Sequence, residues 1–144
     1  MRKIVSGMAV IAVIAGAASC KKSDNNPTSI YTVANFAGNY QLTALTGSLS
    51  GLTANLYDSV PPCQKDNIIQ LKTDMTASYV DLGIKCTPPT DSSGVWKLSP
   101  KADTIYIAGN ALFIKSWDGK TLVGTSNQAN SGFNFAVTST FTKQ

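Results

Sequence analysis

The chain has 144 residues and a formal net charge of +4, with no histidine and no glutamate. Without histidine it lacks the Ser-His-Asp and Cys-His arrangements that activate nucleophiles, and it has no His-ligated zinc site. Its lysines are scattered along the sequence rather than gathered in a stripe, which argues against a nucleic-acid partner. We therefore expect a protein that is not an enzyme, uses no cofactor or metal and binds no nucleic acid.

The first residues have the layout of a secretory signal peptide. Residues 1–3 include the basic Arg2 and Lys3, residues 4–14 are mostly apolar, and small residues follow. The next segment, Ala-Ala-Ser-Cys at residues 17–20, resembles the lipobox of bacterial lipoproteins, in which a peptidase cuts before the cysteine. The resemblance implies that residues 1–19 are removed and that Cys20 is the lipid attachment site, carrying acyl chains such as palmitate. An ordinary cleaved signal peptide and a retained membrane helix are the alternatives.

Residues 20–35 are predicted to form a flexible tether, because they are polar and contain Pro27. Lys21 and Lys22 followed by Asp24 resemble the surface-export signals of lipoproteins in Bacteroidota, and a plain solvated linker is the alternative. These features predict a lipid-anchored protein of the cell envelope and favour the outer membrane. Whether the domain faces the periplasm or the cell surface stays open.

Residues 36–144 are expected to fold as one all-β domain. They are rich in Thr, Ser, Val, Ile and aromatic residues, which is typical of strands. Eight strands are predicted, over residues 38–44, 67–73, 76–82, 94–99, 103–108, 111–117, 120–126 and 132–142. Because short turns join most of them, neighbours should pair antiparallel, and the eight-stranded meander can close into an up-and-down barrel. A β-sandwich is the alternative.

One stretch, residues 46–62, differs from the strand pattern. Leu49, Leu52 and Leu56 fall at positions i, i+3 and i+7, which predicts a short helix starting near Ser48. We expect this stretch to lie at the mouth of the barrel, either as a lid over a ligand or as a plug that belongs to the core.

Turn positions predict which side chains face the barrel interior. A two-residue turn at residues 109–110 sets Ile105 opposite Ile114, facing inward. The same register sets Tyr106 opposite Phe113, facing outward.

The two last predicted strands follow the Asp-Gly turn at residues 118–119. The length of that turn decides whether Val123 or Leu122 faces inward, because a slip of one residue exchanges the two faces. In the final strand, apolar and polar residues alternate, and this alternation predicts an inward face that includes Phe135 and Phe141.

Several motifs of the domain resemble a known family. Gly-Asn-Tyr at residues 38–40 looks like the Gly-X-Trp opening of lipocalins. The pattern of Cys63 and Cys86 followed by Gly-Val-Trp-Lys-Leu at residues 94–98 is similar to small lipocalin-like lipoproteins of Bacteroidota. Over residues 36–144 this resemblance implies an antiparallel barrel behind a lipid anchor.

The two remaining cysteines are predicted to form a disulfide. Once Cys20 is acylated, Cys63 and Cys86 are the only thiols left, and the signal peptide directs the domain to an oxidising compartment. They precede the second predicted strand and follow the third, so an antiparallel hairpin brings them to the same end. Two reduced, buried thiols are the alternative.

Two functions are compatible with such a barrel. In the first, the interior binds a small apolar ligand, since an eight-stranded barrel is wide enough to hold one. The candidate ligand-binding residues are Tyr40, Leu52, Leu56, Tyr57 and Trp96.

In the second, the barrel is solid and serves as an accessory or interaction module of an envelope or cell-surface complex. The candidate partner contacts are Tyr106, Phe113 and Trp117. An interior void distinguishes the two functions, because a pocket of about 300 Å³ or more would favour a ligand.

Overall fold

The computed structural model describes residues 30–130 and 133–144 of the chain. The predicted signal peptide, the predicted lipid attachment site Cys20 and most of the predicted tether lie outside these residues. In chain order the elements are α1 (Val33–Phe36), β1 (Gly38–Leu49), β2 (Leu52–Asn55), the 3₁₀ helix η1 (Tyr57–Ser59), α2 (Pro62–Lys65), β3 (Ile68–Leu71), β4 (Thr76–Val80), β5 (Ser92–Leu98), β6 (Thr104–Ile107), β7 (Asn110–Trp117), β8 (Thr121–Asn130) and β9 (Phe133–Lys143).

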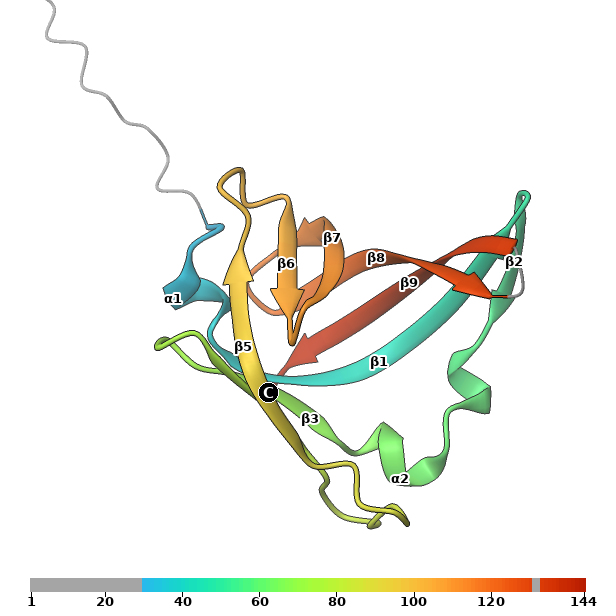
Figure 1. Cartoon of the computed structure of the whole chain (residues 1–144), viewed down its shortest axis with the longest axis horizontal. Helices are drawn as coiled ribbons and strands as arrows, with labels where there is room; N and C mark the ends of the chain where they lie inside the picture. The colour runs from blue at the N-terminus through green and yellow to red at the C-terminus, as the bar shows by residue number, and fades with distance from the viewer. Residues whose placement is uncertain (1–29, 131–132) are drawn as a thin grey trace, which may run out of the picture.

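The strands form a closed antiparallel barrel (Figure 1). Strands β3 to β9 pair with their neighbours in sequence order, and β1 pairs with both β3 and β9, which closes the ring. The predicted eight-stranded up-and-down meander is therefore confirmed, and the sandwich is excluded. A further strand, β2, pairs with the far end of β1 and extends the sheet beyond the ring.

The predicted helix near Ser48 is wrong, because the chain forms a β-hairpin there. β1 continues to Leu49 and turns back through Ser50 and Gly51, which have positive φ angles of 49° and 84°. Two-residue turns with both φ angles positive match the right-handed twist of the flanking strands. Leu49 pairs with Leu52 across the turn. The spacing that predicted one helical face therefore also places these leucines on one face of a hairpin.

The β6–β7 turn lies one residue earlier than predicted. Ala108 and Gly109 are the two turn residues, with φ angles of 48° and 84°. Ile105 consequently pairs with Leu112 rather than with Ile114. Because the register moves by two residues, the side chains around this turn keep their predicted faces, and both Ile105 and Leu112 are buried.

A β-bulge in β7 turns Trp117 inward, against the prediction that it faces outward. The register between β7 and β8 shifts at Lys115, and an extra residue of this kind reverses the facing of the strand beyond it. Trp117 is 4% exposed, and its ring stacks on Phe36 with the centroids 4.9 Å apart. It pairs with Leu122, which is also buried, so Leu122 rather than Val123 faces the core.

The core fills one end of the barrel, which we call the closed end. Helix α1 lies across this end and buries Phe36, whose carbonyl accepts a hydrogen bond from the Tyr40 hydroxyl at 2.7 Å. Burial raises the pKa of that hydroxyl above its ordinary value. The Trp96 indole N–H donates to the carbonyl of Lys72 at 2.8 Å. The buried cluster comprises Phe36, Tyr40, Leu71, Ala77, Trp96, Ile105, Leu112, Trp117 and Leu122.

Strand lengths make the barrel wall uneven. The strands β1, β8 and β9 have 12, 10 and 11 residues, whereas β3, β4 and β6 have only 4 or 5. The wall is therefore tall on the side of β1, β8 and β9 and low elsewhere (Figure 1). Opposite the closed end, the barrel opens between the tall wall, the β1–β3 connection, the β4–β5 loop and the β6–β7 turn.

Candidate ligand-binding site

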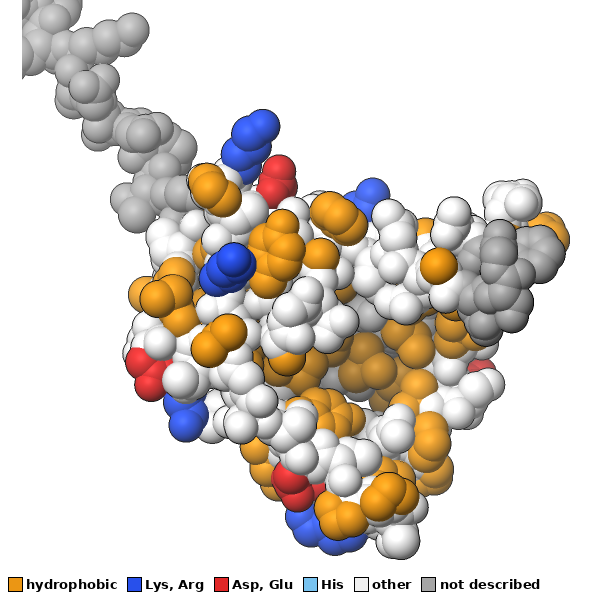
Figure 2. Space-filling model, viewed as in Figure 1, with side chains coloured by type: hydrophobic (Ala, Val, Ile, Leu, Met, Phe, Trp, Pro, Cys, Tyr) orange, Lys and Arg blue, Asp and Glu red, His pale blue; other side chains and the backbone are white. Residues whose placement is uncertain are grey.

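The open half of the barrel is hollow, and Figure 2 shows this space lined by hydrophobic side chains. Three cavities of about 220, 180 and 490 Å³ lie there. Ile69 and Tyr79 line the first and second, Ile107 lines the second and third, and Phe141 lines the first and third. The cavities are therefore adjoining compartments of one space, which we call the hollow.

Alternate residues of the tall wall line the first compartment. The register between β1 and β9 shifts at Thr43, and this bulge allows both Leu42 and Leu45 to face inward. Val60 and Gln64, from the connection between β2 and β3, cover the compartment from the open end. Val60 belongs to residues 46–62, the segment predicted as a lid or plug, which thus contributes one side chain to the wall of this compartment.

A buried amide fixes the polar side of the first compartment. Asn67 is 2% exposed, and its Nδ2 donates to the hydroxyls of Tyr79 and Thr90, at 3.2 Å each. Its Oδ1 accepts from the N–H of Leu82 at 2.9 Å. Asn67 therefore holds both the Tyr79 hydroxyl and the β4–β5 loop in place at the edge of the hollow.

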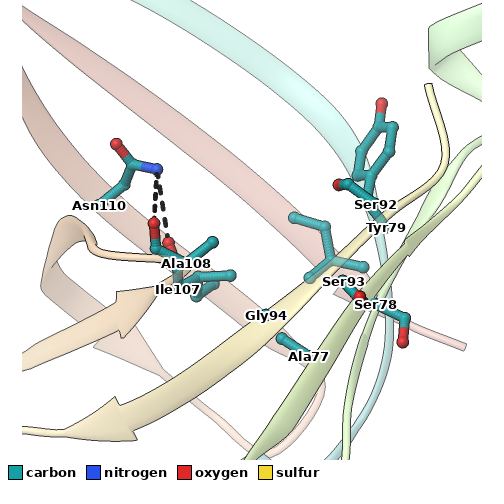
Figure 3. Close-up of a pocket in the computed structure, with 10 residues that line it drawn as sticks. Ala77, Ser78, Tyr79, Ser92, Ser93, Gly94, Ile107, Ala108 and Asn110 are labelled. Carbon is teal, nitrogen blue, oxygen red and sulfur yellow. Dashed lines mark hydrogen bonds between the residues drawn. The ribbon is translucent and has the colours of Figure 1, made fainter.

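The second compartment lies between β4, β5 and the β6–β7 turn (Figure 3). A Cβ atom on Gly94 would lie 3.1 Å from the Cβ of Ala108, so glycine allows the turn to approach β5 closely. The Asn110 amide donates to the carbonyls of Ile107 and Ala108, at 3.5 and 3.4 Å. These contacts fix the turn against β5 at the edge of the compartment.

The third compartment is a slit in the wall. Pairing between β7 and β8 ends at Phe113 and Thr125, and β8 continues beyond that point paired only with β9. Ala111 and Asn127 line opposite sides of the resulting space. The hollow can therefore be entered through the mouth and through this slit.

An apolar surface continues the inner face of the tall wall past the hollow, and we call it the ledge. Its residues are Gly47, Leu49, Leu52, Ala54, Leu56 and Phe135, and they border a space of about 340 Å³. Leu52 is 79% exposed and Leu49 is 45% exposed. Leu56 lies against Gly47, where a Cβ atom would come within 2.9 Å of its Cδ1. The N–H of Leu56 donates to the carbonyl of Leu45 at 2.8 Å, next to the first compartment.

The predicted disulfide between Cys63 and Cys86 is confirmed. It joins α2 to the β4–β5 loop at the open end, with the Cα atoms 5.2 Å apart. Two carboxylates hold the same loop, since Asp81 accepts from the N–H of Cys86 at 3.1 Å and Asp66 accepts from the N–H of Ile84 at 2.8 Å. This rim is therefore crosslinked beside the hollow.

The predicted ligand-binding residues fall in three different places. Tyr40 lines the first compartment, and Leu52 and Leu56 lie on the ledge. Trp96 is buried in the core and lines none of these cavities. Tyr57 also lies outside them, with the Lys65 ammonium 4.9 Å from the centroid of its ring.

Most residues that line the hollow were not among the predicted ligand-binding residues. Four apolar and aromatic examples are Leu42, Leu45, Ile69 and Tyr79. Ile69 and Tyr79 pair with each other across β3 and β4, so the alternation of those two strands carried the signal that could have found them.

One of the three predicted partner-contact residues is buried. Phe113 is 45% exposed, and Tyr106 is partly buried with the Lys97 ammonium 5.3 Å from its ring centroid. Trp117, the third candidate, lies in the core. One exposed and one partly buried aromatic side chain remain of the predicted three-residue patch.

The charged groups of the domain lie outside the hollow and the ledge. None of the residues that line the four cavities described above carries a charge. Three aspartates instead accept hydrogen bonds at the turns of the closed end. These hydrogen bonds hold the pKa of each carboxyl below its ordinary value. These pairs are Asp74 with Thr76, Asp103 with Ser99, and Asp118 with Thr121.

Residues 30–130 and 133–144 contain no cluster of three or more cysteine or acidic side chains that could hold a metal ion. Among the helices they form, none has the length and apolar character needed to cross a membrane.

The fold and the site define an eight-stranded up-and-down barrel with a hollow, open end. No family model matches the chain, and no curated protein matches it. Among the solved structures, the chain is similar to a complex of bovine odorant binding protein with a selenium-containing odorant, at 10% sequence identity and a TM-score of 0.47. The likeness covers 78% of this chain and 73% of that one.

Proposed function

We propose that this protein is a lipid-anchored, lipocalin-like envelope protein whose barrel binds a small apolar ligand and catalyses no reaction. The observation that carries the proposal is the hollow, whose compartments adjoin through Ile69, Tyr79, Ile107 and Phe141. Small-molecule sites are typically concave, mostly apolar and furnished with a few fixed polar groups. The hollow has this composition, and a solid interaction module would instead fill the same volume with side chains.

The placement of the ends of the domain supports the same function. The described chain begins beside α1 at the closed end, whereas β2 and the ledge lie at the other end of the long axis (Figure 1). The predicted tether therefore joins the described residues at the closed end, away from the mouth. The ligand can then reach the hollow while the protein stays attached to a membrane.

The binding proposal is tested by filling the hollow from one position. Ser139 is 9% exposed and lines the first compartment, and the adjacent Thr140 faces the other side of β9. We expect Ser139→Phe to weaken binding of the neutral apolar dye N-phenylnaphthylamine by about tenfold or more. A tenfold weaker affinity corresponds to a loss of about 1.4 kcal/mol of binding free energy. Fluorescence titration of the purified protein measures the change.

The matched control is Thr140→Phe, which adds the same ring outside the hollow and should bind the dye as the original chain does. Circular dichroism of both variants checks that the barrel is folded. The binding proposal fails if the original chain does not bind the dye, or if a folded Ser139→Phe variant binds it with unchanged affinity.

The proposed lipid anchor is inferred from the sequence of residues 1–20, and it is tested separately. We expect Cys20→Ala to abolish incorporation of labelled palmitate and to leave the uncut precursor, because the substitution removes both the sulfur and the cleavage site. A gel of labelled cells reports both results. Incorporation that persists in the variant would show that Cys20 is not the attachment site.

A further inference from the structure

The hollow and the ledge lie on one continuous inner face. On β1 this face passes from Leu45 in the hollow to Gly47 and Leu49 on the ledge, at steps of two residues. On β9 it passes from Ser139 in the hollow to Phe135 on the ledge, four residues away. Alternate residues of a strand share a face. A molecule that follows the tall wall can therefore contact both regions without crossing the sheet.

The ledge is too exposed to be part of the folded core. Leu52 exposes 79% of its surface and Leu49 exposes 45%, and they face each other at the tip of the β1–β2 hairpin. Paired apolar side chains in this position contribute little to the stability of the fold. Exposed apolar patches mark surfaces that bind a ligand, a membrane or another protein. Because the ledge continues the hollow, one elongated molecule can contact both regions.

The side chains that line both regions are uncharged. The polar groups at the hollow are hydroxyls and amides, including those of Tyr79, Asn110, Asn127 and Ser139. No ammonium or carboxylate lines either region to pair with an ionised ligand. Burying an unpaired charge is far more costly than burying a hydroxyl that finds a hydrogen bond.

We propose that the ligand is an uncharged, elongated amphiphile, such as a long-chain alcohol or an ester of one, that runs from the hollow over the ledge. This inference rests on the proposed binding function and adds to it the charge and the length of the ligand. The hydroxyls and amides of the hollow hold the polar group, and the ledge holds the part of the alkyl chain that extends past Leu45.

The charge of the ligand is tested with three head groups on one chain. Dodecanol, dodecanoate and dodecylammonium are titrated against the purified protein at neutral pH, by displacement of N-phenylnaphthylamine. We expect the alcohol to bind at least about tenfold more tightly than either ion, because the lining offers no counter-charge. Equal or tighter binding of either ion overturns the inference. Displacement by an ion would still leave apolar binding itself, and hence the proposed function, standing.

The length of the ligand is tested with alcohols from octanol to hexadecanol. We expect affinity to rise by about two- to fourfold per methylene along the series, since each buried methylene contributes a constant amount. In the double variant Leu49→Ser/Leu52→Ser the rise should stop at a shorter chain. The matched control is Ile84→Ser/Val95→Ser, which removes two exposed apolar side chains that do not line the ledge.

Two results would overturn the role of the ledge. In the first, the ledge variant gives the same chain-length series as the original chain and the control. In the second, the ledge variant loses binding to phosphatidylcholine vesicles while its alcohol series is unchanged, which would assign the ledge to a membrane surface. Binding of short alcohols and of the dye in the hollow reports on the proposed function separately in every variant.

Discussion

Replacing Trp117 by alanine is expected to lower the free energy of unfolding by about 3–5 kcal/mol, the usual cost of truncating a large buried side chain. Trp117 is 4% exposed, stacks on Phe36 and lies 5.9 Å from the ring centroid of Tyr40. The substitution therefore opens a cavity where α1 packs on the closed end. Urea unfolding, followed by far-ultraviolet circular dichroism, measures the loss.

The matched control for this prediction is Phe113→Ala in the same strand. Phe113 is 45% exposed and lies before the bulge, on the outer face. Its truncation should cost about 1 kcal/mol or less, because only part of its apolar surface is removed from water. Equal costs at the two positions would show that the strand continues past Lys115 without the bulge.

Removing the disulfide is expected to destabilise the domain by roughly 3 kcal/mol. Cys63 and Cys86 are 23 positions apart, so the bridge closes a loop of 24 residues when both ends are counted. Closing a loop of this size restricts the unfolded chain, and the chain-entropy relation gives the stated magnitude. Urea unfolding of the Cys63→Ser/Cys86→Ser variant measures it.

Reductant separates the bridge from the substitutions themselves. Dithiothreitol should lower the stability of the original chain to near that of the double variant and should leave the variant unchanged. A loss below about 1 kcal/mol in the variant would contradict the crosslink as a stabilising feature of this rim. Dye binding in the variant then reports whether the rim also shapes the hollow.

The strand order could be read from the sequence because its signals are local. Alternation in residues 133–142, the Asp-Gly pair at residues 118–119 and the short turns each specify structure within a few residues. Such signals predicted a meander, and the observed pairing of β1 with β9 closes it. The disulfide was also predictable, since the hairpin of β3 and β4 brings Cys63 and Cys86 to one end.

The bulges were not predictable, and they account for the error at Trp117. The residue types at the two bulges, Lys115 and Thr43, do not differ from those of ordinary strand residues. The helix predicted from Leu49 and Leu52 was wrong for a different reason. A spacing of three residues fits one face of a helix and also the two ends of a two-residue turn, so periodicity alone does not separate them.

The hollow depends on distances that no short stretch of sequence specifies. Its compartments exist because β3, β4 and β6 are short, because β8 leaves β7 after Thr125, and because Gly94 lets the β6–β7 turn approach β5. Each feature is read from the strand pairing rather than from residue type. Inward-facing residues such as Phe141 could be predicted from the sequence, but whether they meet one another or border a void could not.

The central claim, that the hollow of the barrel binds a small apolar ligand, is tested most directly by mapping the bound molecule. Amide chemical shifts of the purified protein would be recorded by nuclear magnetic resonance during titration with N-phenylnaphthylamine. We expect the largest changes around Leu45, Tyr79 and Ser139, which line the first compartment, and small changes around Tyr106 on the outer face. Changes that concentrate around Tyr106 and its exposed neighbour Lys97, or a titration without localised changes, would contradict the account.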